Sequence, residues 1–170
     1  MGARQHIVVM GVSGSGKTTV ATRLAERLHR PFAEGDDLHP PANVEKMRAG
    51  TPLTDDDRWP WLGAIRDWLS GQAVQGRSTV VTCSALRRTY RDVLRTAEGG
   101  VVFVHLAVDP AVVGRRLDER AGHFMPPSLL DSQYDALEPL GEDEDGITVP
   151  ANDSPDRIVD VIVERLRLSG

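Results

Sequence analysis

The stretch Gly-Val-Ser-Gly-Ser-Gly-Lys-Thr, from Gly11 to Thr18, constrains this chain more than any other, because it matches the phosphate-binding pattern G-x-x-x-x-G-K-[S/T]. An apolar run from His6 to Gly11 precedes the motif, and a stretch from Lys17 to His29 with helical apolar spacing follows it. Glycines let backbone N–H groups turn toward phosphate oxygens, and the start of the helix adds its positive end. The motif therefore predicts a nucleotide-binding α/β fold, and its context outweighs the alternative of an incidental glycine-rich turn.

Each position of this loop has an expected role. Lys17 is expected to reach the β- and γ-phosphates of ATP, and Thr18 to offer its hydroxyl to Mg²⁺. ATP contacts are expected along the whole loop, from Gly11, Val12, Ser13, Gly14, Ser15, Gly16, Lys17, Thr18 and Thr19. The loop does not choose the acceptor, since water, a nucleotide, a metabolite or no acceptor at all is compatible with it.

Apolar runs alternate with amphipathic stretches along the chain, which is typical of βαβ units on a parallel sheet with helices on both faces. The predicted strands are His6 to Gly11, Arg30 to Glu34, Ser78 to Ser84, Val101 to Val108 and Gly146 to Val149. The predicted helices are Lys17 to His29, Asp109 to Arg120 and a last one that begins at Pro155 after the N-cap Ser154. Two more helical stretches, Pro41 to Ala49 and Asp56 to Trp68, read as an insert of about residues 39–73 over the sheet edge, and about residues 120–130 read as a lid.

The composition of the chain indicates how many domains it forms, what it binds and in which compartment it works. We expect residues 1–170 to form one domain, and a net charge of -5 argues against a nucleic-acid binder that works by general electrostatics. Cys83 is the only cysteine, which favours a reducing compartment, and we expect it to be a small buried hydrophobe. The chain shows neither a secretory signal nor an apolar run long enough to cross a membrane, so the expected place is the cytoplasm.

Acidic residues follow the second predicted strand, where open α/β sheets bind ligands. We expect Asp36 to align or deprotonate the acceptor hydroxyl, and Glu34 to hold a water of the Mg²⁺ shell. The alternative is a solvated acidic turn, because Asp and Gly are common turn residues.

Several motifs in fixed order resemble the gluconokinases, the ATP-dependent gluconate kinases. They are Gly35 to Pro40, Asn43 to Met47, Gly50 to Arg58, Pro60 to Leu62, Cys83 to Arg88, Tyr90 to Asp92 and Gly122 to Phe124. The resemblance implies a three-layer P-loop NTPase fold like that of shikimate kinase and adenylate kinase, with five parallel strands in the order 2-3-1-4-5. It also implies phosphorylation of D-gluconate to 6-phosphogluconate, and often a homodimer. Glu34 departs from the pattern, because many relatives carry Asp there.

A carboxylate substrate needs a fixed cation, and a bidentate Arg provides both charge and geometry. Arg58 is our first choice for that cation and Arg87 the second, with a surface ion pair as the alternative for each. His39 is expected to hydrogen-bond a substrate hydroxyl, unless it only packs or caps before Pro40. Ser84 ends the third predicted strand over the site, where it either contacts substrate or simply terminates the strand.

Charge that develops on the transferring phosphoryl group needs cations that arrive on closure. Arg116 and Arg120 lie one helical turn apart before the expected lid, and the resemblance favours a catalytic role over a solvated basic face; Arg116 is also expected to contact ATP. Asn152 lies near where relatives hold adenine. Two rivals stay open: another small-molecule kinase of this fold, acting on shikimate or a nucleoside monophosphate, and a nucleotide-binding switch without a metabolite acceptor.

Overall fold

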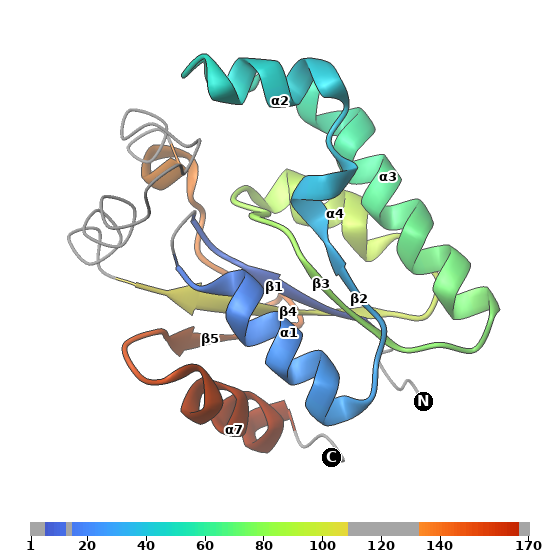
Figure 1. Ribbon diagram of the computed structural model, residues 1–170, viewed down its shortest axis with the longest axis vertical. Coiled ribbons are helices and arrows are strands. Elements are labelled where there is room, and N and C mark those ends of the chain that lie inside the picture. Colours follow the sequence, from blue (N-terminus) through green and yellow to red (C-terminus); the bar gives the residue numbers. More distant parts are fainter. Residues whose placement is uncertain (1–5, 13–14, 109–132, 167–170) are drawn as a thin grey trace.

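The computed structural model describes residues 6–12, 15–108 and 133–166, and a five-stranded sheet runs through them (Figure 1). The strand order is β2-β3-β1-β4-β5, and every pairing is parallel. The order implied by the resemblance is therefore confirmed. The strands are β1 (His6–Met10), β2 (Phe32–Glu34), β3 (Thr79–Thr82), β4 (Val101–Ala107) and β5 (Gly146–Pro150).

The central strands are apolar on both faces, as expected for a parallel sheet that is covered on both sides. In β1, Ile7 and Val9 point into one hydrophobic core, while Val8 and Met10 point into the other. All four side chains are completely buried. Helices must therefore cover both faces, and the fold has three layers.

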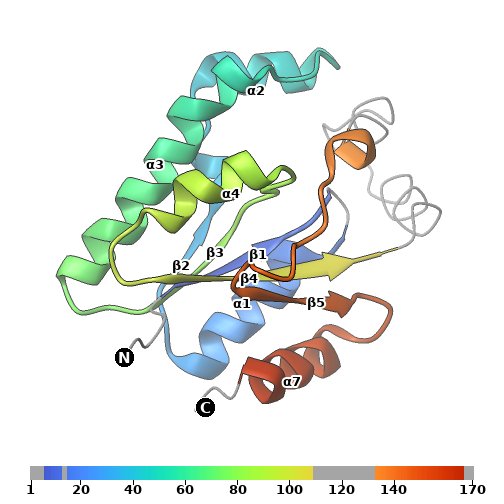
Figure 2. The ribbon, with the colours of Figure 1, turned by 180° about the vertical axis from the view of Figure 1, so that it is seen from behind.

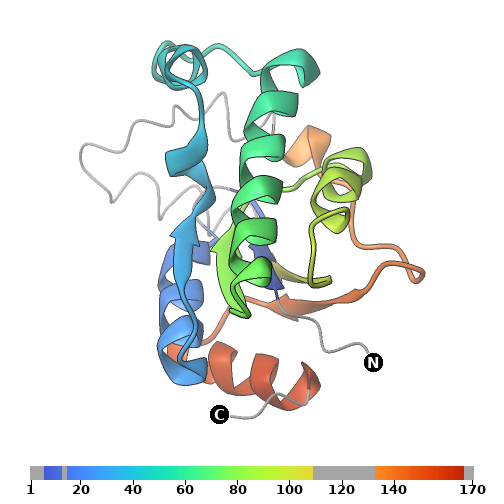
Figure 3. The ribbon, with the colours of Figure 1, turned by 90° about the vertical axis from the view of Figure 1, so that its right-hand side faces the viewer.

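Among the described residues, four helices cover the two faces of the sheet (Figures 2 and 3). Their positions follow from their buried residues, which join one core or the other. The helices α1 (Lys17–Leu28) and α7 (Pro155–Leu166) pack on one face, and α3 (Asp55–Val74) and α4 (Arg88–Arg95) pack on the other. As predicted, Ser154 precedes α7, and its hydroxyl accepts a hydrogen bond of 3.3 Å from the backbone N–H of Arg157.

The region between β2 and β3 departs from the expected edge insert. It contains the 3₁₀ turn η1 (Gly35–Leu38), the helix α2 (Pro41–Arg48) and then α3, which is longer than predicted. Ile65 and Leu69 of α3 are completely buried against the sheet, so α3 is the crossover helix between two parallel strands. By contrast, α2 stands away from the sheet, beyond the carboxyl end of β2 (Figure 3).

The helix α4 was not predicted from the sequence, and its composition explains why. Its sequence, Arg-Thr-Tyr-Arg-Asp-Val-Leu-Arg, is mostly polar, and one of its buried residues is Arg91. A charged residue in the buried stripe hides the apolar periodicity of a helix. The predicted helix Asp109 to Arg120 and the expected lid of about residues 120–130 lie outside the described residues. No helix in the described ranges is long and apolar enough to cross a membrane.

Candidate active site

The phosphate-binding loop joins β1 to α1, as the motif predicts. Gly16 caps α1 with a φ of 94°, a left-handed conformation that favours glycine. The backbone N–H of Ser15 donates to the carbonyl of Val12 over 3.2 Å, which closes the turn. The backbone N–H of Gly11 donates to the carbonyl of Ser84 over 3.3 Å, so the loop starts against the end of β3. Ser13 and Gly14 lie outside the described residues.

Lys17 folds back over this loop. Its Nζ atom donates to the carbonyls of Gly11 and Val12 over 2.9 and 3.0 Å. Burial lowers the pKa of Lys17, and the carboxylates of Asp36 and Glu34 oppose that effect. The ammonium group is thus held at the loop within range of both predicted acidic residues.

Glu34 joins three elements at the carboxyl end of the sheet. The Thr18 hydroxyl donates to Glu34 Oε2 over 2.7 Å, and the Thr82 hydroxyl donates to Glu34 Oε1. The structure therefore brings together the two residues that we expect to serve Mg²⁺. Hard oxygen atoms are the ligands that Mg²⁺ prefers, and it usually keeps several waters, so this pair fits the ion. The described part of the chain holds no group of three or more His, Cys, Asp or Glu residues arranged for a metal.

Asp36 lies in the turn η1, which is anchored on both sides. The backbone N–H of Gly35 donates to the Thr82 hydroxyl over 3.1 Å, and the indole N–H of Trp61 donates to the Gly35 carbonyl over 2.8 Å. Only glycine fits at position 35, because an added Cβ would lie 1.9 Å from the carbonyl oxygen of Thr82. The anchored turn exposes 57% of the Asp36 side chain.

His39 is packed and oriented by its neighbours. Its ring stacks on Trp61 with centroids 4.0 Å apart, and its side chain is only 3% exposed. Burial and the charge of Arg58 lower the pKa of His39 to about 4, so the ring is neutral near pH 7.

Asn43 determines which ring nitrogen of His39 carries the proton. Its Nδ2 atom donates to the carbonyl of Asp57 over 2.8 Å, which assigns the amide orientation. The same Nδ2 lies 3.1 Å from His39 Nδ1, so Nδ1 accepts and Nε2 carries the hydrogen. His39 Nε2 is 3.9 Å from Asp36 Oδ1. That separation exceeds a hydrogen bond, and an oxygen atom placed between them can accept from Nε2 and donate to Asp36.

Arg58 is held on the same side of the site. Its Nη1 atom donates to the Tyr90 hydroxyl over 3.0 Å, and its guanidinium lies 5.2 Å from the centre of the Tyr90 ring. Asp55 Oδ1 lies 3.7 Å from the same Nη1 and accepts from the Tyr90 hydroxyl. Because its charge also acts on His39, Arg58 belongs to the Asp36 and His39 group.

The loop after β3 forms another wall of the site. Ser84 is half-buried beside the start of the phosphate-binding loop, and Arg87 is exposed at the N-cap of α4. Burial raises the pKa of Tyr90, while the charges of Arg58 and Arg87 act against that shift, so Arg87 lies within electrostatic range of the same tyrosine. Cys83 is buried as expected, and burial raises its pKa to about 12, which leaves its thiol unreactive.

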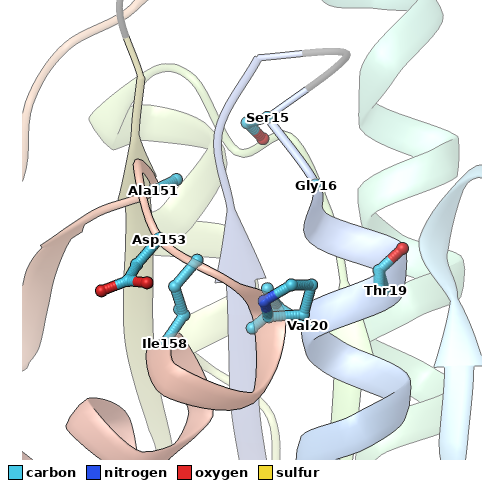
Figure 4. Close-up of a pocket in the computed structure, with 8 residues that line it drawn as sticks. Ser15, Gly16, Thr19, Val20, Ala151, Asp153 and Ile158 are labelled. Atoms are coloured by element: carbon cyan, nitrogen blue, oxygen red, sulfur yellow. The ribbon is translucent and has the colours of Figure 1, made fainter. Parts of the chain in front are cut away.

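A pocket of about 160 Å³ opens beside the phosphate-binding loop (Figure 4). It lies between the start of α1 and the turn that joins β5 to α7, near where the family resemblance places adenine. Its lining residues are Ser15, Gly16, Thr19, Val20, Ala151, Asp153, Pro155 and Ile158. Asn152 is not among them, although both of its neighbours are.

Sequence reasoning missed several residues that shape this site, namely Asn43, Trp61, Thr82 and Tyr90. Asn43 begins one of the motifs that carry the family resemblance, but its burial, with only 3% of the residue exposed, is visible only in the structure. Trp61 was expected to be core, which is correct, and it also anchors η1. Trp59 was expected to be core and is 38% exposed. Arg116 and Arg120 lie outside the described residues.

Comparisons with known proteins agree with this geometry. A family model described as "AAA domain" matches residues 7–140. The chain is 52% identical over 163 residues to a gluconokinase of Gluconobacter oxydans (strain 621H), a match that covers 96% of this chain and 92% of the relative.

Two solved structures are similar along nearly the whole chain. A sugar kinase from Janibacter sp. HTCC2649 has a TM-score of 0.94 at 47% identity, covering 98% of this chain and 96% of the other. A gluconokinase from Sinorhizobium meliloti 1021 has a TM-score of 0.83 at 44% identity, covering 98% of each chain.

Proposed function

The chain belongs to the gluconokinase family of P-loop kinases, and we propose that it transfers the γ-phosphoryl group of ATP to D-gluconate to give 6-phospho-D-gluconate. The observation that carries this proposal is a chain of neighbours: the charge of Arg58 acts on His39, His39 Nε2 lies 3.9 Å from Asp36 Oδ1, and the Asp36 carboxylate acts on Lys17. A carboxylate, a neutral N–H donor and a guanidinium beside a phosphate-binding loop suit a polyhydroxy acid.

The reaction needs a hydroxyl in line with the γ-phosphorus. Asp36 takes the proton of that hydroxyl while the new O–P bond forms and the bond to the bridging oxygen of ADP breaks. Lys17 turns from the carbonyls of Gly11 and Val12 to the phosphate oxygens when ATP is bound. Its positive charge then stabilises the negative charge that develops on the phosphoryl group.

The acid end of the substrate is assigned to Arg58. Its contact with Tyr90 leaves other N–H groups of the guanidinium to pair with a carboxylate, and the side chain is 20% exposed. His39 donates from Nε2 to a hydroxyl along the sugar acid. Ser84 and Arg87 complete the acceptor side, and Arg116 and Arg120 are assigned to the closing lid.

The oxygen atoms of Thr18 and Glu34 suit a Mg²⁺ ion, Glu34 acting through a water. The ion would neutralise charge on the β- and γ-phosphates. ATP itself is assigned to the phosphate-binding loop, including Ser13, Gly14 and Thr19, with its base toward the pocket beside Ala151 and Asn152.

We also propose that residues 1–170 form one domain, that the protein works in the cytoplasm, and that it forms a homodimer. The chain has one cysteine, Cys83, and it is buried. The compartment is supported by that lone thiol, and the dimer by the family resemblance. Light scattering of the pure protein tests the dimer, which a monomer mass at micromolar concentration would overturn.

An acceptor panel tests the reaction. The pure protein is mixed with ATP and Mg²⁺ and with gluconate, shikimate, AMP or no acceptor, and ADP release is measured. Among these acceptors, we expect only gluconate to cause rapid ADP release. Release with shikimate or AMP but not gluconate would point to another kinase of this fold, and ATP binding without stimulated turnover would favour a switch module.

A further inference from the structure

Arg91, a residue with no part in the chemistry above, is completely buried in α4. Its Nη2 lies 3.1 Å from Glu144 Oε2, and its Nε donates to Glu144 Oε1 over 3.2 Å. The Glu144 side chain is also fully buried. A buried ion pair costs so much desolvation that it stabilises a fold weakly, if at all, compared with apolar residues. Stability alone therefore accounts poorly for this pair, and Arg91 makes a further contact outside it.

That contact goes to the acceptor side of the site. Arg91 Nη1 donates to the carbonyl of Ala85 over 2.8 Å. Ala85 has a φ of 45°, a left-handed conformation that costs about 1 kcal/mol for a residue with a Cβ atom. Ser84 precedes it and Arg87 follows two residues later, so the direction of the Ala85 peptide determines where both assigned substrate residues lie.

The segment that leads into β5 also contacts this loop, and it runs beside the start of α4 (Figure 2). The backbone N–H of Glu138 donates to the carbonyl of Leu86 over 2.6 Å, and its side chain accepts from the backbone N–H of Arg88 over 2.7 Å. Glu144 Oε2 also accepts from the backbone N–H of Gly141 over 3.0 Å. The pair of Arg91 and Glu144 thus connects this segment, α4 and the loop.

We propose that Arg91 is a positioning residue that, through the Ala85 carbonyl and with Glu144 as its anchor, holds the loop 84–87 in the shape that binds the acceptor. Arg91 does not touch the substrate. The proposal rests on the proposed function, because it assumes that Ser84 and Arg87 meet the acceptor there.

Arg95 provides a matched control on the same helix. Its Nη2 lies 2.8 Å from Glu144 Oε1, and its guanidinium lies 5.1 Å from the centre of the Phe103 ring. It therefore shares the buried carboxylate with Arg91 from the far end of α4, one turn farther from the loop. A role limited to stability predicts similar kinetic effects for both residues.

The test compares Arg91→Lys with Arg95→Lys. Lysine keeps the positive charge near Glu144, but its single ammonium group cannot replace the three-nitrogen geometry that reaches Ala85 as well. We expect Arg91→Lys to raise KM for gluconate about tenfold or more, because small misplacements of binding groups have large effects, and to leave KM for ATP within about twofold. Arg95→Lys is expected to leave both KM values within about twofold.

A rescue experiment separates positioning from general damage. Glycine adopts a positive φ without strain, so Ala85→Gly in the Arg91→Lys background should recover part of the affinity for gluconate. Equal KM changes for both lysine variants, or an unchanged KM for gluconate in folded Arg91→Lys, would overturn the proposal. If Arg91→Lys does not fold, the same comparison uses the Arg91→Met and Glu144→Met double variant, which removes both charges of the buried pair while Arg95 keeps its ion pair with Asp92.

Turnover of the wild-type protein in the acceptor panel distinguishes a failure of the proposed function from a failure of the role proposed for Arg91. If wild-type protein does not turn over gluconate, the proposed function has failed, and the KM comparison is made with whichever acceptor the panel identifies. If wild-type protein turns over gluconate but Arg91→Lys and wild type have equal KM values, only the role of Arg91 has failed.

Discussion

At the scale of single residues, two carboxylates that are adjacent in the chain can have different surroundings. Asp36 and Asp37 are adjacent in η1 and both are exposed, but the Asp36 carboxylate lies near His39 and acts on Lys17. The difference comes from the anchors of the turn, which hold Gly35 between Thr82 and Trp61. These two carboxylates therefore form a natural pair for testing the proposed base.

Asp36→Asn is expected to lower kcat by about a hundredfold or more, because the amide cannot accept the proton of the hydroxyl. KM for ATP should stay within about twofold, since Asp36 is assigned to the acceptor. Steady-state kinetics with ATP varied at saturating gluconate measure both kcat and KM for ATP. Asp37→Asn is the control, and an equal loss of kcat in the two variants would contradict the role of Asp36.

His39 makes stability depend on pH, with a sign that follows from its environment. Its pKa is about 4 in the folded chain against 6.5 for a free side chain, so the unfolded chain binds the proton first as pH falls. The contribution of His39 to the free energy of unfolding is therefore present above pH 6.5 and is lost as pH falls toward 4. We expect His39→Gln to remove about 2 kcal/mol of the difference in unfolding free energy between about pH 7.5 and about pH 5.

Urea unfolding at the two pH values measures that difference for wild type and variant. Two other buried histidines, His6 and His105, have their pKa lowered mainly by burial and are unchanged in this comparison. A pH dependence equal to that of wild type in His39→Gln would show that the proton uptake lies elsewhere.

At the scale of elements, close backbone contacts and helix ends position the site. The helix α3 begins with a capping box, in which the Thr54 hydroxyl accepts from the backbone N–H of Asp57 and Asp57 Oδ2 accepts from that of Thr54. This fixes the first turn of α3, which contains Arg58 and, one turn later, Trp61. Three acidic residues in that turn also suit the positive end of the helix.

Two glycines in this region should respond oppositely to alanine. Gly35→Ala is expected to lower the free energy of unfolding by about 3 kcal/mol or more, because the added Cβ would overlap the Thr82 carbonyl and must push η1 from β3. Gly71 lies in α3 with no atom within 4 Å of an added Cβ. Gly71→Ala should therefore stabilise the chain by about 0.5–1 kcal/mol. Urea unfolding tests both, and a mild effect of Gly35→Ala would contradict the tight contact.

At the scale of the whole molecule, the sheet brings the site together from distant parts of the chain. The phosphate-binding loop follows β1, Glu34 ends β2, and Ser84 comes just after β3. Because β1, β2 and β3 are parallel neighbours, their carboxyl ends meet at one edge. The residues assigned to ATP and to the acceptor therefore lie at the ends of neighbouring strands of one sheet.

Nucleotide binding should stabilise this assembly as one unit. With Mg²⁺ and ATP at about a hundred times its Kd, we expect the free energy of unfolding to rise by about 2.7 kcal/mol. Lys17→Met should remove most of that gain, because its ammonium is assigned to the phosphates. Thermal unfolding with and without nucleotide measures the gain, and an undiminished shift in Lys17→Met would contradict the assignment.

Much of the fold was predictable from local patterns. The five strands and the helices α1, α2, α3 and α7 were expected within a few residues at most ends, although α3 is six residues longer at its C-terminal end than predicted, ending at Val74 instead of Trp68. The helix α4 was missed, because the buried Arg91 interrupts its apolar stripe. The structure groups the expected Thr18 with Glu34, and Asp36 with His39 and Arg58, although their catalytic roles stay predictions.

The amino-acid sequence by itself determined the phosphate-binding loop and the alternation of strands and helices, because glycine spacing and apolar periodicity act over a few residues. Only the tertiary structure decided which polar groups meet. Thr82 reaches Glu34 across 48 residues of chain, and Arg91 reaches Glu144 across 53. Such pairs form because packing on the sheet buries polar groups that must then find partners, and no short pattern records where those partners lie.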